Sequence, residues 1–284
     1  MKKQTDVPAL RWGFVGTGGI ADAMANVVAT TPLAELRAVS SRRATSANEF
    51  ADRFDVALRF DGWQAMLGSD DIDAVYVATP TSVREEISIA AANAGKHVLA
   101  EKPFASSASV KRIIDACRKN DVAFMDGTHF VHHPRHHAIK NGMAELVGNP
   151  WSIASAFQFG LPNRGDIRYN AKLEPMGAIG DAGWYNMRAA LEYLPRDAAP
   201  ASVEAVLRRD EGTGAAISGS GVIQFTDGST TTWNCGFDSG ALVMDLCITG
   251  FEGVVKIDNF LSQDEDGSAR YFYKRGSWGP DVIR

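Results

Sequence analysis

The sequence predicts an α/β part with a doubly wound parallel sheet, followed by an α+β part with an open, mostly antiparallel sheet. In the first half, short apolar runs alternate with amphipathic stretches of helical length, as expected for parallel strands joined by crossover helices. After about residue 128, strand-like runs follow one another between Gly, Asp and Ser turns. The 284 residues, 45% of them hydrophobic, are enough for two modest cores. We therefore expect two domains, residues 1–128 and 129–284.

The first domain is defined by strands and helices that alternate along the chain. The strand-like runs cover residues 10–15, 33–39, 72–78, 97–100 and 122–125. The helical stretches between them cover residues 20–29, 46–54, 82–94 and 107–120, and Gly95 and Asn120 are suitable residues to end two of them. Because crossovers between parallel strands are right-handed, this order predicts a doubly wound sheet that binds its ligand at the carboxyl ends of the strands.

The second domain begins with one helical stretch, residues 134–146, and continues mainly as strands. The candidate strands cover residues 152–159, 203–208, 216–225, 229–237, 242–249 and 254–257. Asp227-Gly228 predicts the clearest hairpin, because this pair supplies the positive φ angles of a tight turn. We expect an open sheet with helices on one face.

Charge and composition exclude several classes of protein. The 34 acidic and 29 basic residues give a formal charge of −5, so no net positive field favours nucleic acid as a partner. The sequence has neither a signal-type apolar run near its start nor a membrane-length apolar segment, which predicts a cytoplasmic protein without a membrane partner. The three cysteines lack C-x-x-C spacing, so neither a disulfide framework nor a structural zinc site is expected.

A glycine turn follows the first strand and opens the first helix. Its sequence is Gly16-Thr17-Gly18-Gly19-Ile20-Ala21, which matches the fingerprint of a Rossmann dinucleotide-binding domain. Gly16 permits the tight turn, Gly18 lets the backbone approach a pyrophosphate, and the small Ala21 lets helix and strand pack closely. The amides at the helix N-terminus face the phosphates. The alternative interpretation is a turn that merely joins a strand to a helix.

The end of the second strand bears on the choice of cofactor. An acidic residue there would bind the ribose of NAD, but this sequence has Ser41-Arg42-Arg43. Hydroxyl and guanidinium groups suit a 2′-phosphate, so NADP(H) is favoured over NAD(H), which stays the second choice. Alternatively, the two arginines are only the solvated start of a helix.

Three further motifs accompany the glycine turn. They are Glu101-Lys102-Pro103 after strand 97–100, Ala78-Thr79-Pro80-Thr81-Ser82 after strand 72–78, and Gly180-Asp181-Ala182-Gly183-Trp184-Tyr185. With these motifs, almost the whole chain resembles the Gfo/Idh/MocA oxidoreductase family. It is most similar to the branch that contains dimeric dihydrodiol dehydrogenase and the glucose-fructose oxidoreductases. The resemblance implies that Lys102 lies near the nicotinamide and the reacting oxygen, that Pro103 follows a cis bond, and that Asp181 and Tyr185 complete the site.

These roles agree with the chemistry of hydride transfer. Transfer to a carbonyl leaves an alkoxide that must be protonated, and a phenol with an ordinary pKa of about 10 needs a nearby cation for that work at neutral pH. We assign Tyr185 as proton donor or acceptor, Lys102 as its electrostatic partner, and Asp181 as an orienting carboxylate or a ligand of a substrate hydroxyl. If a helix begins near Asp181, the two residues share a face and the acid stabilises the N-terminus. Otherwise Asp181 is a simple N-cap and Tyr185 a core aromatic.

The expected substrate is therefore a secondary alcohol or ketone on a sugar, cyclic polyol or dihydrodiol. Beside the glycine turn, Thr79, Pro80, Thr81, Glu101 and Lys102 are expected to contact the cofactor. Two features depart from the family pattern. Val83-Arg84 occupies the stretch where many relatives carry His. The chain also ends soon after Gly276-Ser277-Trp278, earlier than family chains do, so we expect a trimmed last region or an incomplete sequence. By resemblance, the sheets of homologues pair between subunits, which predicts a homodimer or a higher homo-oligomer.

Five histidines between residues 129 and 137 suggest a metal site as a rival hypothesis. His132 with His136, or His133 with His137, has i, i+4 spacing. No Glu completes an H-E-x-x-H pattern and no cysteine is near, so we expect no metal. The weaker substrate candidates are His132, Arg135, Asn163 and Arg168. A non-catalytic nucleotide-binding regulator is the other rival, although Lys102, Asp181 and Tyr185 together count against it.

Overall fold

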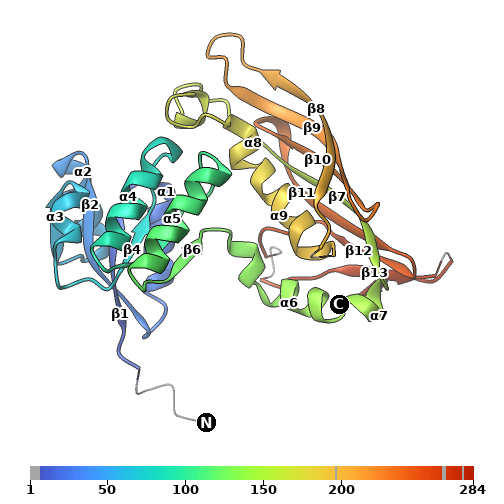
Figure 1. Ribbon diagram of the computed structural model, residues 1–284, viewed down its shortest axis with the longest axis horizontal. Coiled ribbons are helices and arrows are strands. Elements are labelled where there is room, and N and C mark those ends of the chain that lie inside the picture. Colours follow the sequence, from blue (N-terminus) through green and yellow to red (C-terminus); the bar gives the residue numbers. More distant parts are fainter. Residues whose placement is uncertain (1–6, 196, 264–266, 277) are drawn as a thin grey trace. The chain divides into compact units, whose positions relative to one another are not determined.

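The computed structural model describes residues 7–195, 197–263, 267–276 and 278–284, and it divides into two compact units, residues 1–127 and 128–284. Figure 1 colours the first unit from blue to green and the second from green to red. Each unit has its own sheet and its own core, so each is described by itself. Among the helices of the described residues, none is long and apolar enough to cross a membrane.

The first unit is built on a six-stranded sheet in the order β3-β2-β1-β4-β5-β6, with every neighbouring pair parallel. Its strands are β1 (Leu10–Val15), β2 (Ala34–Ser41), β3 (Leu58–Asp61), β4 (Ala74–Val77), β5 (His97–Ala100) and β6 (Phe124–Asp126). Its helices are α1 (Gly19–Val28), α2 (Ala44–Phe54), α3 (Trp63–Leu67), α4 (Thr81–Asn93) and α5 (Ser107–Lys119). This order confirms the predicted doubly wound Rossmann sheet.

Strand β1 lies at the centre of this sheet because its carboxyl half is apolar on both faces. Phe14, Val39 and Tyr76, from β1, β2 and β4, are fully buried, and the rings of Phe14 and Tyr76 pack 4.9 Å apart. The chain order reverses at β1, which has β2 on one side and β4 on the other. In such sheets ligands bind outside the carboxyl ends of the strands at this switch point. The turns after β1, β2, β4 and β5 therefore meet where a cofactor is expected.

The second unit carries an eight-stranded sheet in the order β14-β13-β12-β11-β7-β10-β9-β8. Its strands are β7 (Pro150–Gly160), β8 (Pro200–Arg209), β9 (Ala216–Phe225), β10 (Thr230–Gly236), β11 (Asp238–Gly250), β12 (Gly253–Ile257), β13 (Phe272–Arg275) and β14 (Val282–Ile283). Its α-helices are α6 (Pro134–Asn141), α7 (Met143–Leu146), α8 (Gly177–Asp181) and α9 (Gly183–Tyr193), with short 3₁₀ turns η2 (His129–His132) and η3 (Ile167–Tyr169).

The predicted mostly antiparallel sheet is confirmed, and β7 and β10 form its one parallel pair within the described residues. Helices α8 and α9 lie along one face of this sheet (Figure 1), where they contact β7, β9 and β10. Ile153, Leu246 and Ile248 are almost fully buried in the core of this unit. The expected hairpin joins β9 to β10, but of the pair Asp227-Gly228 only Gly228 has a positive φ, +84°.

Two helical expectations need correction. The stretch 134–146 is not one helix, because Gly142 both ends α6 and precedes α7, as expected from the low helix propensity of glycine. Asp181 does not begin the helix that carries Tyr185. It is the last residue of α8, and α9 starts after Ala182, so Asp181 cannot act as an N-terminal acid on α9. The short elements β3, α3, β13 and β14 were not predicted, because runs of two to five residues carry little periodic signal.

Burial of His136 predicts a pH-dependent stability of the second unit. Its side chain is 4% exposed, contacts the Tyr193 hydroxyl at 2.9 Å, and has its pKa lowered to about 4 by burial, despite the nearby Glu192 carboxylate. Below the unfolded value of 6.5, the unfolded chain binds the proton more readily, so stability falls as the pH drops toward 4. We expect His136 alone to cost about 2 kcal/mol of unfolding free energy between pH 7.5 and pH 5.

Urea unfolding at pH 7.5 and pH 5 measures this effect. The His136→Gln variant should lose much less stability between the two pH values than the unmodified chain. His133, whose pKa is lowered first of all by burial, acts in the same direction and stays in both proteins. Glu192, with a pKa lowered to about 2, loses its stabilising effect only below pH 4.5 and does not disturb the comparison. If both proteins lose the same unfolding free energy between pH 7.5 and pH 5, His136 is not the cause of the pH dependence.

Candidate active site

The glycine turn after β1 has no room for a side chain at Gly16, whereas Gly18 and Gly19 face open space. Gly16 has φ of +111°, and a Cβ atom added there would lie 2.5 Å from the carbonyl oxygen of Ala78, which follows β4. Gly18 caps α1 without a side-chain hydrogen bond, and added Cβ atoms at Gly18 and Gly19 would meet nothing within 4 Å. Ala21 is fully buried against the sheet. The turn therefore presents free helix N-terminal amides to open space, which is the environment that a pyrophosphate requires.

Strand β2 ends in groups that suit a phosphate rather than a ribose diol. Ser41 is its last residue, and Arg42 and Arg43 follow on the exposed surface. Arg43 donates from Nε to the Ser46 hydroxyl at 3.1 Å, so it is partly engaged at the start of α2. No carboxylate of the described chain pairs with Arg42. Arg42 is therefore the cation that is available to an incoming anion at this edge.

The turn after β5 is fixed by a buried hydrogen bond from the neighbouring strand. Tyr76 on β4 is fully buried and donates its hydroxyl proton to Glu101 Oε1 at 2.6 Å. The other carboxylate oxygen of Glu101 accepts from the backbone N–H of Lys102 at 3.2 Å. An added Cβ atom on Gly127 would lie 2.9 Å from Glu101 Oε1, so a larger residue there would displace this carboxylate. Lys102, which is half-buried, leads into Pro103 through a cis bond.

Arg84 joins two of these turns, a role that the sequence did not reveal. It lies on α4, is 4% exposed, and donates to the carbonyl oxygens of Thr79 and Pro103. Its NH1 group also donates to the Thr81 hydroxyl at 3.2 Å. The Thr79-Pro80-Thr81 turn is thus tied to the turn that carries Lys102. The only available signal was the arginine that replaces the histidine of many relatives.

The polar groups at this edge fit a dinucleotide. The hydroxyl oxygens of Ser40, at the end of β2, and Thr79, after β4, are buried and have no hydrogen-bond partner among the described residues. Buried polar atoms are normally satisfied, so such orphans at a ligand edge point to a polar ligand. Together with the uncapped α1 N-terminus, they leave a cradle of donors that nicotinamide dinucleotides can use.

In the second unit, Tyr185 lies on α9 with its ring buried and 6% of its surface exposed. The rings of Phe130 and Phe157 pack against it at 6.3 and 5.5 Å between centroids. Its hydroxyl lies 3.3 Å from Nδ1 of His129, whose Nε2 is 2.9 Å from the carbonyl oxygen of Leu261. The ring is thus held by apolar packing while its hydroxyl sits in a polar environment.

Asp181 is brought together with Arg168, one of the weaker candidates. Arg168 Nε donates to Asp181 at 2.7 Å, and its NH1 group lies 3.2 Å from Asp166. Burial opposes the charge of Arg168, but the two carboxylates outweigh it and raise the pKa of the guanidinium above its ordinary value. The guanidinium therefore stays charged, and Arg168 links the loop after β7 to the end of α8.

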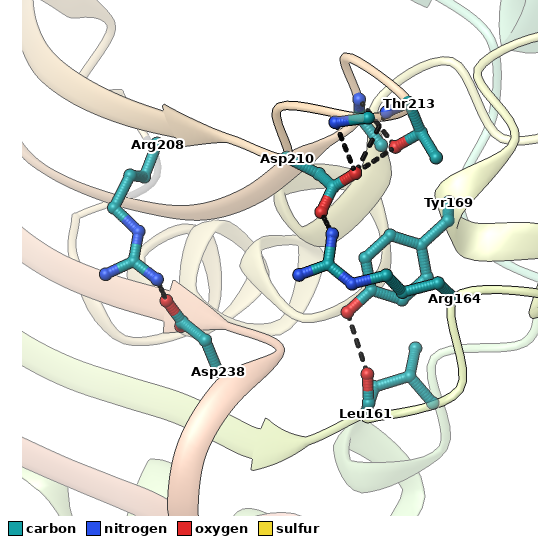
Figure 2. A network of polar contacts seen from close by, with 9 residues as sticks. Leu161, Arg164, Tyr169, Arg208, Asp210, Thr213 and Asp238 are labelled. Carbon is teal, nitrogen blue, oxygen red and sulfur yellow. Dashed lines mark hydrogen bonds and ion pairs between the residues drawn. The ribbon is translucent and has the colours of Figure 1, made fainter.

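The same loop is anchored on its other side, as Figure 2 shows. Arg164 forms an ion pair with Asp210, which follows β8 and is 3% exposed, and it lies 5.9 Å from the centre of the Tyr169 ring. Asp210 also accepts from the backbone and side chain of Thr213, at 2.9 and 3.0 Å (Figure 2). The hydroxyl of Tyr169 donates to the Leu161 carbonyl at 2.7 Å. The loop that presents Arg168 is therefore fixed at both ends.

The remaining candidates are placed differently. Asn163 lies in the exposed part of this loop, where its side-chain oxygen accepts from the Gly165 amide at 3.0 Å. His132 is exposed at the end of η2. Arg135 is 6% exposed and donates to the backbone carbonyls of Asn259, Ser262 and Arg270, which is a structural role. Among the described residues, no three His, Cys, Asp or Glu side chains are arranged to hold a metal.

The chain is similar to known proteins over most of its length. Residues 10–128 match the model of an oxidoreductase family with an NAD-binding Rossmann fold. The chain is similar to dTDP-3,4-didehydro-2,6-dideoxy-alpha-D-glucose 3-reductase of Actinomadura kijaniata, 33% identical over 84% of this chain and 71% of that enzyme. It is also similar to D-xylose 1-dehydrogenase (NADP(+)) 2 of Haloferax volcanii, 29% identical over 81% of this chain and 70% of that enzyme. A solved 3-ketoreductase from Actinomadura kijaniata, in complex with NADP and TDP-benzene, superposes with a TM-score of 0.87 at 29% identity, covering 97% of this chain and 84% of that one.

Proposed function

The chain belongs to the Gfo/Idh/MocA family and is an NAD(P)-dependent oxidoreductase, and we propose that Lys102, Asp181 and Tyr185 form its catalytic set. The proposed reaction interconverts a ketone and a secondary alcohol on a sugar, cyclic polyol or dihydrodiol, with NADP(H) as the preferred cofactor. The observation that carries the proposal is the Tyr185 hydroxyl, held in a polar contact on an otherwise apolar ring.

The cofactor is held, in this proposal, by the carboxyl edge of the first sheet. The amides of residues 17–20 bind the pyrophosphate, while the Gly16 amide donates to the Ser40 carbonyl oxygen and holds the tight turn beside it. Ser41, Arg42 and Arg43 bind the 2′-phosphate. The Thr79-Pro80-Thr81 turn and Glu101 line the nicotinamide end, where Arg84 holds the two turns in register. When bound, the reduced nicotinamide supplies the hydride that the reduction needs.

The chain's own residues transfer the proton to and from the substrate oxygen. Tyr185 gives its hydroxyl proton to the carbonyl oxygen in the reduction, or takes the alcohol proton in the oxidation. The ammonium group of Lys102 stabilises the negative charge that develops on that oxygen and on the phenol. Asp181, which accepts a hydrogen bond from Arg168, orients a substrate hydroxyl by accepting its hydrogen bond as well. His132 and Asn163 are retained as weaker substrate contacts, whereas Arg135 is fully engaged with backbone carbonyls.

The similarity to dehydrogenases and reductases favours this enzyme over a non-catalytic regulator and over a histidine-dependent metalloenzyme. The direct test is a fluorescence titration with NADPH and NADH. A screen of keto-sugars, free and nucleotide-linked, inosose-like ketones and dihydrodiols then follows with the better cofactor. Binding of neither nucleotide would overturn the proposal at its root, and binding without turnover of any ketone or alcohol would overturn its catalytic part.

Arg42 should decide between the two nucleotides. Arg42→Ala is expected to weaken NADPH binding by about 10-fold, because a charge-assisted contact to phosphate contributes roughly 1.5–3 kcal/mol and this arginine is exposed. NADH affinity should stay within about 2-fold, since NADH lacks the 2′-phosphate. Arg118→Ala, an exposed arginine at the end of α5, is the matched control. Equal weakening of both nucleotides by Arg42→Ala would mean that the arginine does not recognise the 2′-phosphate.

We also propose that the chain forms a homodimer or a higher homo-oligomer, through the end of the second sheet at which β7 begins and β11 ends. Trp151, near the start of β7, and Phe251, directly after β11, are 41% and 76% exposed, and their rings lie 6.4 Å apart. Such an exposed aromatic pair is a common anchor of protein interfaces. Light scattering of the purified chain, beside a Phe251→Lys variant, measures whether this aromatic pair joins two copies.

A further inference from the structure

The Tyr185 hydroxyl is connected to a second titratable group that the proposed reaction has not yet used. Tyr185 is 6% exposed, so its own surface gives water little access to the phenol. His129, which begins η2, is exposed, and its Nδ1 atom lies 3.3 Å from the Tyr185 hydroxyl oxygen. The two rings meet edge to face, 5.4 Å apart between centroids. A buried acid-base group and a solvent-exposed one are therefore in hydrogen-bond contact.

The second nitrogen of His129 fixes the direction of this hydrogen bond. Nε2 lies 2.9 Å from the carbonyl oxygen of Leu261. A carbonyl oxygen can only accept, so Nε2 must carry a proton and donate it. In the neutral imidazole Nδ1 then has no proton, and it accepts the hydrogen bond from the Tyr185 hydroxyl. In the imidazolium both nitrogens donate, and Nδ1 directs its proton at the Tyr185 oxygen.

We propose that His129 is a proton relay between Tyr185 and solvent, in which Nδ1 is the nitrogen that gains and loses the proton. This inference rests on the proposed function of Tyr185. His129 acts through Tyr185 and is therefore a positioning and relay residue rather than a group that touches the substrate. The contact with Leu261 keeps the ring oriented in both protonation states, because Nε2 donates to the same carbonyl throughout.

In the reduction, the carbonyl carbon receives the hydride from the reduced nicotinamide and its oxygen receives the proton of Tyr185. The Tyr185 oxygen takes the proton from Nδ1 of His129, which leaves a neutral imidazole with its proton on Nε2. Water then returns a proton to Nδ1, since the His129 side chain is exposed to solvent. The sum is one ketone, one reduced cofactor and one proton converted to one alcohol and one oxidised cofactor. The oxidation runs through the same steps in reverse.

The first experiment reads the tautomer without turnover. Nitrogen-15 NMR of histidine-labelled full-length chain is recorded above the pH range in which histidines ordinarily titrate. The His129 signals are assigned as those that disappear in His129→Asn. We expect a protonated Nε2 and an unprotonated Nδ1, and we expect Tyr185→Phe to shift the Nδ1 resonance by removing its donor. A proton on Nδ1 of the neutral ring would overturn the relay.

The second experiment separates relay from mere orientation. Asn at position 129 places an amide group near the site of Nδ1, so it can keep the hydrogen bond but cannot carry a proton. With the substrate that the screen identifies, His129→Asn should lower kcat by about 10- to 100-fold. This loss is at or below the lower end of the roughly 10²–10⁴-fold that a positioned proton-transfer group contributes. KM and NADPH affinity should stay within about 2-fold, and added imidazole should restore part of the rate.

His137→Asn is the matched control, because His137 is an exposed histidine on α6 outside the proposed machinery, and its kcat should be unchanged. If His129→Asn keeps wild-type kcat, the relay is overturned, whatever the tautomer.

The relay and the proposed function fail in different ways. A wild-type chain that turns over no ketone or alcohol contradicts the proposed function, whereas a proton on Nδ1 of neutral His129 contradicts the relay alone.

Discussion

Replacing Tyr185 by Phe should lower kcat for ketone reduction by about 100- to 1,000-fold, while the affinity for NADPH stays within about 2-fold of the unmodified chain. A positioned general acid contributes about 10²–10⁴-fold, and this variant removes the proton that the alkoxide needs in the transition state. The phenyl ring keeps its packing against Phe130 and Phe157, so the fold of α9 is preserved. Stopped-flow or steady-state oxidation of NADPH with the identified substrate measures the loss.

Lys102→Ala tests the other half of the same acid-base unit. Lys102 is assigned to stabilise charge on the oxygen that Tyr185 protonates. The variant with both Lys102→Ala and Tyr185→Phe should therefore lose little more kcat than the less active of the two single variants. Strictly additive losses would place the two groups in independent roles. Tyr273→Phe, on β13 outside the proposed site, controls for the loss of a tyrosine hydroxyl and should retain full activity. Near-normal turnover of both Tyr185→Phe and Lys102→Ala would refute the catalytic set.

The sequence predicted most of the fold because its apolar runs alternate in a regular order with stretches of helical length. That alternation predicted a doubly wound sheet, and the strand order observed agrees with it. The corrections occur beside glycines. Gly142 interrupts one predicted helix, and α9 begins at Gly183 rather than near Asp181. Glycine has a low helix propensity, but whether a helix ends at a given glycine also depends on tertiary packing.

The candidate site was predicted less completely, and for a specific reason. Motifs identify residues that lie close in sequence, such as Glu101-Lys102-Pro103, but they do not reveal contacts between distant ones. Tyr76 holds Glu101 from 25 positions away, and His129 meets Tyr185 from 56 positions away. Arg84, 19 positions before Pro103, is another such contact. Each of these contacts depends on the register of strands or helices that no local pattern encodes.

Replacing Gly16 by Ala should weaken NADPH binding by about 100-fold or more, which corresponds to roughly 2.7 kcal/mol. The methyl group would lie 2.5 Å from the Ala78 carbonyl oxygen, a backbone atom that cannot move without shifting the turn after β4. The backbone conformation itself, with φ of +111°, costs an L-residue a further 1–3 kcal/mol or so. The turn must therefore distort, and the amides that face the pyrophosphate lose their alignment.

Gly68→Ala is the matched control for this change. Gly68 lies in the same unit with an ordinary φ of −77°, and its added Cβ atom would be 3.6 Å from the Ala65 carbonyl oxygen, a normal contact. That variant should bind NADPH like the unmodified chain. Circular dichroism and thermal unfolding of both variants separate loss of the cofactor turn from loss of the fold. If folded Gly16→Ala binds NADPH with unchanged affinity, the turn does not hold the pyrophosphate, and the cofactor must be bound elsewhere on the sheet edge.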